Sequence, residues 1–361
     1  MSVRVQLKRR KLLVFLCLSA FVVASNATNH LRPQSATAKD SSLLLAQGGA
    51  RLTGAGASFP APLYQRWFSD FNKKNPSTQI SYQSVGSGAG VQQLINGTVD
   101  FGASDVAMTD AEMAKVSRGV VLIPATAGSV VVGYNLPGVN SLKLSRTTLP
   151  AIFLGEIKSW DDPRIAKDNP GVKLPKTPIT VVYRADGSGT NAIFTEHLSA
   201  ISPTWKSKVG SGKSVSWPTG QGAKGNEGVT AQIKQTPGAI GYIEYGYARS
   251  NKIPYASLQN KAGNFVAPTL ENSRAALASI QLPSNLRAFA PDPSGGNSYP
   301  IVTYSWILAY KTYPDANKAK ALKQALNYGL TTGQDVADDL GYIPLPPSVV
   351  SKSQAAVNSI K

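Results

Sequence analysis

The fold class of this chain is decided by the stretch Ile179-Thr180-Val181-Val182-Tyr183-Arg184-Ala185-Asp186-Gly187-Ser188-Gly189-Thr190. Its first five residues are all β-branched or aromatic and predict a strand, and its glycines predict a turn. Ile193, Phe194 and Leu198 then fall on one face of a predicted helix. A strand, a turn and a helix in this order form the repeating unit of α/β proteins.

Three similar units precede this stretch. They occupy residues 51–71, 79–97 and 99–112, and the last contains a capping box made by Thr109 and Glu112. Further strands are expected at 130–134 and 301–308, further helices at 317–328 and 348–360, and loop-rich stretches at 211–228 and 291–300. Gly329 is expected to stop the first of these helices. The alternation predicts an α/β fold.

The N-terminus has the pattern of a secretory signal peptide. Five basic residues lie among the first eleven, an apolar run follows from Leu12 to Val23, and small residues come next. We predict a signal peptide at 1–24 and a leader tail or tether at 25–49. An uncleaved anchor is the alternative, although the run is shorter than the roughly 20 residues of a membrane span. The only cysteine, Cys17, leaves with the leader, so the mature chain is expected to have no disulfide.

The net charge is strongly positive. The 361 residues include 37 Lys and Arg against 20 Asp and Glu, formally +17, and loss of the leader leaves +12. Hydrophobic residues make up 42% of the chain, enough for a core, which excludes disorder of the whole chain. The charge invites a nucleic-acid-binding hypothesis. However, the basic residues are scattered singly and no DNA- or RNA-binding motif is recognised, so no nucleic-acid partner is expected.

The four turns share glycines, small hydroxyl residues and a following helix start. Glycine lets a ligand approach the backbone closely, and the first turn of a helix leaves N–H groups unpaired at the positive end of its dipole. Such a turn binds an anion without any lysine, and Ser58, Ser87, Ser188 and Thr190 add hydroxyl donors. Ordinary helix capping explains any one turn equally well. Four turns together favour an anion site.

Nucleotide-binding motifs do not fit these turns. The dinucleotide fingerprint that Gly54 begins requires a glycine where Phe59 stands, and a P-loop ending at Gly212-Lys213-Ser214 requires one where Ser207 stands. The predicted ligand is therefore a small free anion.

Two carboxylates accompany the predicted anion site. Arg184 and Asp186 are two residues apart, so on an extended backbone they point the same way. The guanidinium then binds an oxyanion while the carboxylate holds it, or the two form an ordinary surface ion pair. Asp105 repels an anion unless that anion still carries a proton, as phosphate does and sulfate does not.

Several segments resemble the signature motifs of the phosphate-specific ABC transporter substrate-binding proteins. The resemblance runs from about Leu52 to the C-terminus and is carried by residues 53–62, 99–105, 154–162, 184–190 and 237–242. It implies a non-enzymatic periplasmic receptor with a two-lobed α/β fold of the type II periplasmic binding protein kind. In this family phosphate is held dehydrated between lobes that bend about a hinge of two chain crossings.

Carried over to this chain, the resemblance implies a set of phosphate-binding residues: Ser58, Phe59 through its backbone N–H, Ser87, Asp105, Arg184, Asp186, Ser188, Gly189 and Thr190. Asp105 accepts the phosphate proton and Asp186 orients Arg184. Two departures stand out. Ser58 replaces the threonine of many relatives, and the second turn reads Gly86-Ser87-Gly88-Ala89-Gly90 where Gly-Ser-Ser-Gly-Gly is usual.

The implied architecture places the crossings near Gly128 and Ile301. Lobe one is then 50–128 plus 302–361, and lobe two is 129–301. The expected partners are inorganic phosphate and the membrane permease subunits of an ABC transporter, with the receptor itself a monomer and no cofactor or metal bound.

A secreted phosphohydrolase is the alternative function, with Ser188 or Thr190 as nucleophile. After His30 in the leader tail, the only histidine is His197, on the helix that follows the fourth turn. It is expected to be packed or solvated rather than to act as a base, and no His, Asp or Glu cluster has metal-ligand spacing.

Overall fold

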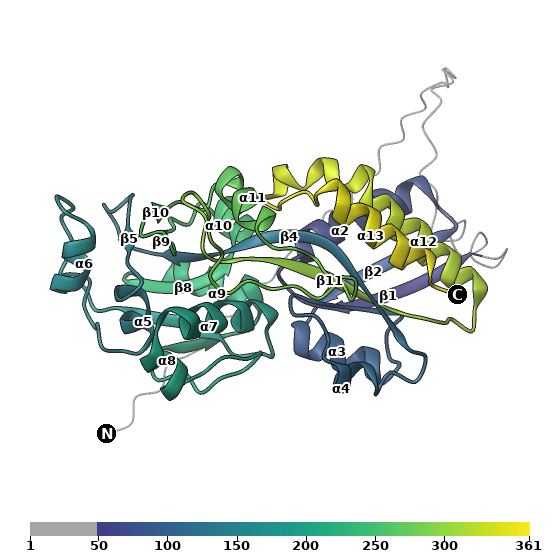
Figure 1. Cartoon of the computed structure of the whole chain (residues 1–361), viewed down its shortest axis with the longest axis horizontal. Coiled ribbons are helices and arrows are strands. Elements are labelled where there is room, and N and C mark those ends of the chain that lie inside the picture. Colours follow the sequence, from purple (N-terminus) through teal and green to yellow (C-terminus); the bar gives the residue numbers. More distant parts are fainter. Residues whose placement is uncertain (1–48) are drawn as a thin grey trace, which may run out of the picture.

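A mixed sheet of eight strands runs the length of the molecule, with helices on both faces (Figure 1). The computed structural model describes residues 49–361, so the predicted signal peptide and all but the last residue of the predicted tether lie outside the described residues. The strand order is β2 (Thr78–Ser84), β1 (Ala50–Gly56), β3 (Phe101–Ser104), β11 (Val302–Tyr310), β4 (Val120–Tyr134), β8 (Ala239–Glu244), β6 (Thr180–Arg184) and β7 (Gln221–Ala223).

The sheet has two halves whose parallel strands point toward each other. We call β2, β1, β3, β11 and residues 120–129 of β4 the first half, and residues 130–134 of β4 with β8, β6 and β7 the second half. β1, β2 and β3 are parallel, as are β6, β7 and β8. β11 is antiparallel to both β3 and β4, and β8 is antiparallel to β4. The carboxyl ends of both parallel sets therefore face the middle of the molecule, where open α/β sheets bind their ligands.

The strand β4 joins the two halves. Its residues 120–129 pair with β11, and its residues 130–134 pair with β8. At the junction, the N–H of Val130 donates to the carbonyl of Ile301 at 3.0 Å. The two chain segments at the predicted crossings thus lie side by side.

Helices cover both faces, and a small second sheet lies beside the second half. The small sheet contains β10 (Phe265–Val266), β9 (Ser257–Gln259) and β5 (Lys143–Leu144). The α-helices are α2 (Ala61–Lys74), α3 (Ser87–Ile95), α4 (Asp110–Met113), α5 (Thr148–Phe153), α6 (Pro163–Asp168), α7 (Gly189–Ile201), α8 (Pro203–Lys208), α9 (Gly225–Gln235), α10 (Tyr245–Asn251), α11 (Leu270–Ala278), α12 (Ala316–Leu330) and α13 (Pro347–Asn358). Two 3₁₀ helices follow α12, at Thr332–Val336 and Asp338–Leu340.

The predicted strand–turn–helix units are confirmed. Helices α2, α3 and α7 follow β1, β2 and β6 directly, and the capping box of Thr109 and Glu112 opens α4. The predicted apolar faces of α2 and α7 are buried. The prediction of a loop-rich stretch at 211–228 is wrong at its end, because β7 forms at 221–223 and α9 begins at Gly225. No side chain caps the start of α9, so the usual sequence signal for a helix start is missing there.

Gly329 does not stop α12. The helix continues through it to Leu330. An ideal Cβ atom at Gly329 would lie 2.7 Å from the ring of Trp67, so this glycine lets α12 pack closely on α2. Close packing, rather than a left-handed helix end, is the physical reason for a glycine at this position.

Each half has its own aromatic core. In the first half, Phe68 packs edge-on against Phe101 and Tyr64 against Tyr82. In the second half, Phe194 stacks on Tyr242 with ring centroids 4.3 Å apart. Burying one such side chain contributes about 1.5–3 kcal/mol, and we estimate that Phe194→Ala would cost about 3–5 kcal/mol of stability.

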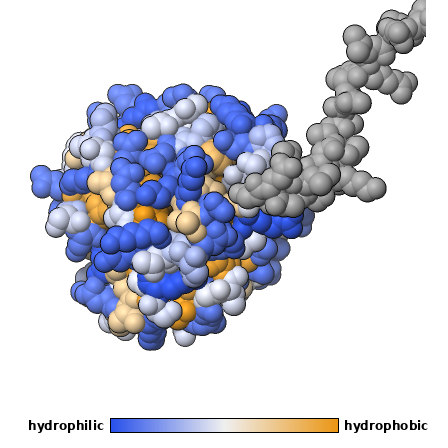
Figure 2. Space-filling view, turned by 90° about the vertical axis from the view of Figure 1, so that its right-hand side faces the viewer, coloured by the Kyte–Doolittle hydropathy of each residue, from blue (hydrophilic) through white to orange (hydrophobic). Residues whose placement is uncertain are grey.

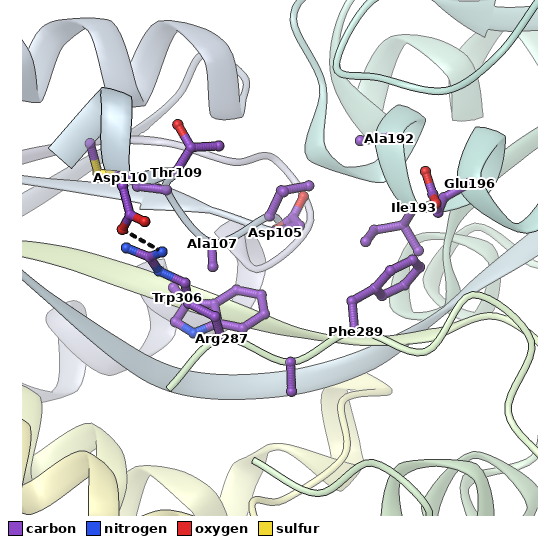
Figure 3. A pocket seen from close by; sticks show the side chains of 13 residues that line it. Asp105, Ala107, Thr109, Asp110, Ala192, Ile193, Glu196, Arg287, Phe289 and Trp306 are labelled. Atoms are coloured by element: carbon purple, nitrogen blue, oxygen red, sulfur yellow. Dashed lines mark ion pairs between the residues drawn. The ribbon is translucent and has the colours of Figure 1, made fainter. Parts of the chain in front are cut away.

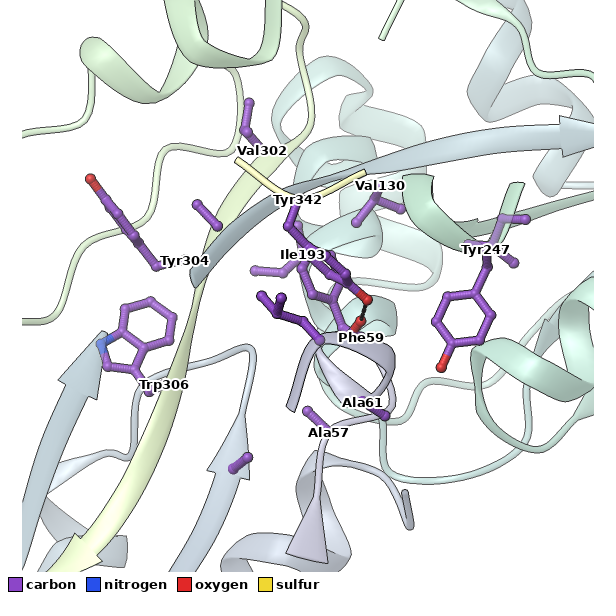
Figure 4. Close-up of a cluster of buried hydrophobic side chains, with 14 of the residues drawn as sticks. Ala57, Phe59, Ala61, Val130, Ile193, Tyr247, Val302, Tyr304, Trp306 and Tyr342 are labelled. Atoms are coloured by element: carbon purple, nitrogen blue, oxygen red, sulfur yellow. Dashed lines mark hydrogen bonds between the residues drawn. The ribbon is translucent and has the colours of Figure 1, made fainter. Parts of the chain in front are cut away.

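A third buried cluster lies where the halves meet. It gathers Phe59, Val130, Tyr304 and Tyr342 from segments far apart in the chain (Figure 4). The Tyr342 hydroxyl donates to the carbonyl of Phe59 at 2.8 Å. The C-terminal segment therefore anchors the turn that precedes α2.

One part of the predicted lobe two lies against the first half. The indole N–H of Trp306 in β11 donates to the Leu286 carbonyl at 2.8 Å, and Arg287 pairs with Asp110 of α4 at 2.7 Å. The chain then returns to the second half, where Asp292 receives two hydrogen bonds of 2.8 Å from Arg146. The segment 286–292 thus spans both halves.

The end of the molecule formed by the first half is largely hydrophilic, with hydrophobic residues scattered among the polar ones (Figure 2). Within residues 49–361, no helix is both long and apolar enough to cross a membrane.

Candidate functional site

Four helices begin where the two halves of the sheet meet. α2, α3, α7 and α9 each start directly after a strand whose carboxyl end faces the middle of the molecule. Bonds across the junction hold these helix starts together. The N–H of Gly88 donates to the carbonyl of Gly187 at 2.8 Å, and the side chain of Asn226 donates to Ser58 Oγ at 2.9 Å. The positive ends of several helix dipoles therefore converge on one place.

The structure brings the predicted site residues together. All of them are buried except Asp186, which is partly exposed. Ser87 Oγ accepts from the N–H of Asp105 at 3.3 Å, and the Thr190 hydroxyl lies 3.5 Å from Asp105 Oδ2. Asn226 links Ser58 to Thr190 by donating to both hydroxyl oxygens, at 2.9 and 3.1 Å. The predicted residues thus lie in one place, to which both halves of the sheet contribute.

Backbone donors are available in the same place. Within residues 49–361, the N–H groups of Phe59, Gly189 and Thr190 have no hydrogen-bond partner. The Ser188 hydroxyl instead caps α7, accepting from the N–H of Asn191 at 3.0 Å. Free N–H groups in the turn before α2 and in the first turn of α7 are the expected donors to an anion.

Gly189 stands where the two halves come closest. An ideal Cβ atom there would lie 2.5 Å from Ser87 Oγ and 2.7 Å from Asp105 Oδ2. Real Cβ atoms do not approach other atoms this closely, so any larger residue would separate these groups. The glycine therefore allows α7 to close against the first half.

Arg184 is a buried cation, and Asp186 binds two of its three guanidinium nitrogens. Its Nε and Nη2 donate to the two oxygens of Asp186 at 2.8 and 2.6 Å. Within the described part of the chain, Nη1 is buried without a hydrogen-bond partner. The arginine side chain is only 1% exposed, which excludes an ordinary surface ion pair. A buried guanidinium with an unused N–H group needs an acceptor, and an oxyanion supplies one.

The two carboxylates of the site have opposite pKa shifts. Burial raises the pKa of Asp105 to about 7, although a hydrogen bond from Ser305 and the charge of Arg184 oppose the rise. Burial also acts to raise the pKa of Asp186. The hydrogen bonds and charge of Arg184 and the N–H of Gly225 outweigh it, so the pKa of Asp186 lies below its ordinary value. Asp186 is therefore a fixed anion, whereas Asp105 is ready to share a proton near neutral pH.

Sequence analysis missed two side chains of the site. Ser305 of β11 donates to Asp105 Oδ1 at 2.8 Å, and Asn226 occupies the start of α9. Ser305 lies in the strand predicted at 301–308, and its position between the hydrophobic Tyr304 and Trp306 was the available signal. Asn226 lies in the stretch predicted as loop, so nothing in its neighbourhood indicated a helix start.

A pocket of about 450 Å³ has Asp105 among the residues that line it (Figure 3). Apolar side chains, including Ile193, Phe289 and Trp306, form much of its lining, and Arg287 pairs with Asp110 at its edge. It shares Asp105 with the anion site, but none of the other predicted phosphate ligands lines it. The pocket is thus a neighbour of the anion site and not its binding surface.

The side chain of His197 is buried and bonds away from the two residues considered as nucleophiles. The Nδ1 atom of His197 contacts the Pro291 carbonyl at 2.7 Å rather than Ser188 or Thr190, and burial lowers the pKa of this histidine. No group of three His, Cys, Asp or Glu side chains among residues 49–361 is arranged to hold a metal ion.

Comparison with known proteins identifies similar sequences and folds. Residues 23–329 match the family model described as the PBP superfamily domain. The chain is 45% identical to the phosphate-binding protein PstS of Pasteurella multocida over 84% of this chain and 89% of that protein. It is 44% identical to PstS of Haemophilus influenzae over 84% and 92%. It is 41% identical to PstS of Methanocaldococcus jannaschii over 85% of each.

Solved structures support the fold. A high-affinity periplasmic phosphate-binding protein solved with phosphate matches 85% of this chain and 93% of its own, with a TM-score of 0.70 and 23% identity. A human phosphate-binding apolipoprotein matches 84% and 93%, with a TM-score of 0.68 and 20% identity. This chain shares with these structures the mixed α/β periplasmic binding-protein fold expected from the sequence.

Proposed function

The chain belongs to the PstS family of phosphate-binding proteins, and on this premise we propose that the buried junction between its two sheet halves is the binding site for inorganic phosphate. Members of this family are the substrate-binding components of phosphate ABC transporters, so the chain is a binding protein and not an enzyme. The proposed ligands are the residues implied by the resemblance: Ser58, Phe59, Ser87, Asp105, Arg184, Ser188, Gly189 and Thr190, with Asp186 holding Arg184.

The observation that carries this proposal is the free Nη1 of Arg184. This atom is buried and has no partner within residues 49–361, while the rest of the guanidinium is held by Asp186. Leaving a buried charged donor unpaired costs more than the roughly 1–3 kcal/mol of a neutral group. A phosphate oxygen bound at Nη1 removes that cost.

The remaining donors are neutral. The free N–H groups of Phe59, Gly189 and Thr190 and the hydroxyl of Ser58 replace the water shell of the anion without adding positive charge. Affinity then comes from many short-range donors and one cation, so it depends on the halves being closed rather than on the net charge of the surface.

Asp105 supplies the selectivity. A carboxylate inside an anion site repels sulfate, which has no proton near neutral pH, but accepts a hydrogen bond from a protonated phosphate oxygen. Arsenate carries a proton too, so it is expected to bind. Burial, which raises the pKa of Asp105 to about 7, favours this sharing of a proton.

The two halves are proposed as the cores of two lobes, 50–128 with 302–361 and 129–301. Ser58, Phe59, Ser87 and Asp105 belong to lobe one, and Arg184 to Thr190 belong to lobe two. Only the closed form satisfies both sets, so phosphate shifts the lobes toward closure. The β4 strand and the adjoining Ile301 form the proposed hinge.

The cellular setting follows from the family and the leader. We propose that the leader is removed on export, that the mature chain works in the periplasm as a monomer, and that it delivers phosphate to membrane permease subunits. The related structures include a protein described as periplasmic, which supports this location.

Isothermal calorimetry of the purified protein with phosphate, arsenate and sulfate tests the proposal. We expect phosphate and arsenate to bind at a one-to-one ratio and sulfate to give no saturable heat at pH 8. Absence of phosphate binding, or equal binding of sulfate, would overturn it. Turnover of a chromogenic phosphate ester that Ser188→Ala abolishes would instead favour the phosphohydrolase.

A further inference from the structure

Asn226 is a buried amide that touches both halves of the site. It is the second residue of α9 and is fully buried. Its N–H and its Nδ2 both donate to Ser58 Oγ, at 3.0 and 2.9 Å, and Nδ2 also donates to Thr190 Oγ1 at 3.1 Å. It therefore reaches from the second half to a serine of the first.

The orientation of this amide is fixed. Asn226 Oδ1 accepts from the backbone N–H of Glu244 at 2.9 Å. A backbone N–H only donates, so Oδ1 must face it and Nδ2 must face the two hydroxyl groups. Nδ2 is thus a donor to Ser58 and to Thr190, and cannot accept from either.

The direction of these bonds determines what the hydroxyls offer a ligand. A hydroxyl oxygen has two lone pairs and one proton. Both lone pairs of Ser58 Oγ are occupied by Asn226, and within residues 49–361 its proton has no acceptor. Thr190 Oγ1 also accepts from Asn226, and its proton has only the 3.5 Å contact with Asp105. Ser58 therefore presents a proton to the ligand, and Thr190 does so once its long hydrogen bond to Asp105 gives way to the anion.

We propose that Asn226 is a positioning residue that makes Ser58 and Thr190 obligate hydrogen-bond donors toward the anion, and does so only when the two halves are closed. This inference rests on the proposed phosphate site. It adds a residue that does not contact phosphate itself but sets the direction of the hydrogen bonds that two ligands make. Without Asn226, each hydroxyl rotates, and the free energy of binding includes the cost of turning it toward the ligand.

A double-mutant cycle between Asn226 and Ser58 tests this inference. In the wild-type protein, Ser58→Ala is expected to weaken phosphate binding roughly 10- to 100-fold, the loss of one hydrogen bond to a charged group. In Asn226→Asp, the new carboxylate oxygen accepts from both hydroxyls and turns their lone pairs toward the anion. Ser58→Ala in this background should change the affinity less than about threefold.

The variant Asn226→Ala provides a second test in case Asn226→Asp folds poorly. In Asn226→Ala the hydroxyl of Ser58 is no longer oriented, and the loss caused by Ser58→Ala should be at least about threefold smaller than in the wild-type protein. Asn169→Asp is the matched control. Asn169 is also buried, and its Nδ2 donates to the carbonyls of Lys143 and Ile165, away from the proposed ligands. In this control the Ser58→Ala loss should remain at its wild-type size.

Calorimetry with inorganic phosphate, and a thermal melt for each variant, separate the outcomes. An equal Ser58→Ala loss in the wild-type, Asn226→Asp and Asn226→Ala proteins means that Asn226 is only a structural residue and overturns the inference. Failure of the wild-type protein itself to bind phosphate overturns the proposed function instead.

Discussion

The first and second halves of the molecule contribute different chemistry to the same site. The first half brings hydroxyls, N–H groups and Asp105, whose pKa burial raises to about 7. The second half brings Arg184, whose charge Asp186 holds in place, together with the N-terminus of α7. In the proposed phosphate site, the second half attracts any oxyanion, whereas the first half selects an anion that carries a proton. Under this proposal, attraction and discrimination are separated in space and act together only when the two halves close.

Removing the cation of the second half should have the largest effect. Arg184→Met deletes the buried positive charge of the proposed site, and we expect phosphate affinity to fall on the order of 1,000-fold, within the range found when one member of a buried charge pair is truncated. Calorimetry measures the change. Arg164→Met is the matched control, because Arg164 forms a similar two-bond pair with Asp162 but is 47% exposed and outside the site. A comparable loss in the control would contradict a specific role.

Wedging the halves apart should have the next largest effect. In Gly189→Ala the added methyl group meets Ser87 and Asp105, so the lobes cannot close fully. We expect about a 100-fold loss of phosphate affinity, and small-angle scattering with phosphate should show a larger radius of gyration than the wild-type complex. Gly228→Ala, in the interior of α9 with its nearest neighbour at 3.5 Å, should change neither measurement. Wild-type affinity in Gly189→Ala would show that closure does not bring these groups together.

Neutralising the carboxylate of the first half should change selectivity more than affinity. We expect Asp105→Asn to bind sulfate about 10- to 100-fold more tightly than the wild-type protein at pH 8, while still binding phosphate. The pKa of Asp105 is raised to about 7, so the wild-type carboxyl becomes protonated as the pH falls through 7. The wild-type protein should therefore bind sulfate more tightly below pH 7. The sulfate affinity of Asp105→Asn should not increase over the same pH range. Equal pH profiles in calorimetric titrations would argue against this role.

The partly exposed ion pair between Lys213 and Glu112 should have the smallest effect on phosphate affinity. Lys213 and Glu112 bridge the two halves at 2.8 Å, but both side chains are partly exposed. Exposed pairs contribute about 0–1 kcal/mol, so Lys213→Gln should weaken phosphate binding less than about fivefold, and high salt should remove the difference. Arg66→Gln, which breaks a pair within α2 alone, serves as the control. A loss above tenfold at high salt would mean that this ion pair contributes to affinity.

The parts of the fold that local sequence specifies were predictable. Strand–turn–helix units follow from apolar periodicity and glycine turns, and they correctly predicted α2, α3 and α7. The position of β11 between β3 and β4 was not predictable, because no local pattern encodes which distant strands become neighbours. The small sheet of two- and three-residue strands was missed for a similar reason, since such strands are too short to show alternation.

The candidate site also contains residues that local sequence predicted and residues that it did not. Arg184 and Asp186 are two residues apart in the sequence, and their pairing follows from an extended backbone. Ser305 and Asn226 reach the site only through long-range packing, at chain distances of 200 residues from Asp105 and 168 from Ser58. The sequence shows that both residues are polar, but it does not show which distant residues they bond to.

The place of β11 in the sheet also bears on the order in which the protein folds. This strand pairs with β3 on one side and β4 on the other, yet it is made after every other strand. During synthesis or export, the second half has all of its strands well before residue 302 emerges, while the first half still lacks the strand that joins β3 to β4. Contacts this distant in the chain form slowly, because a long loop must close first. The half that discriminates between anions is therefore expected to be the last to take shape.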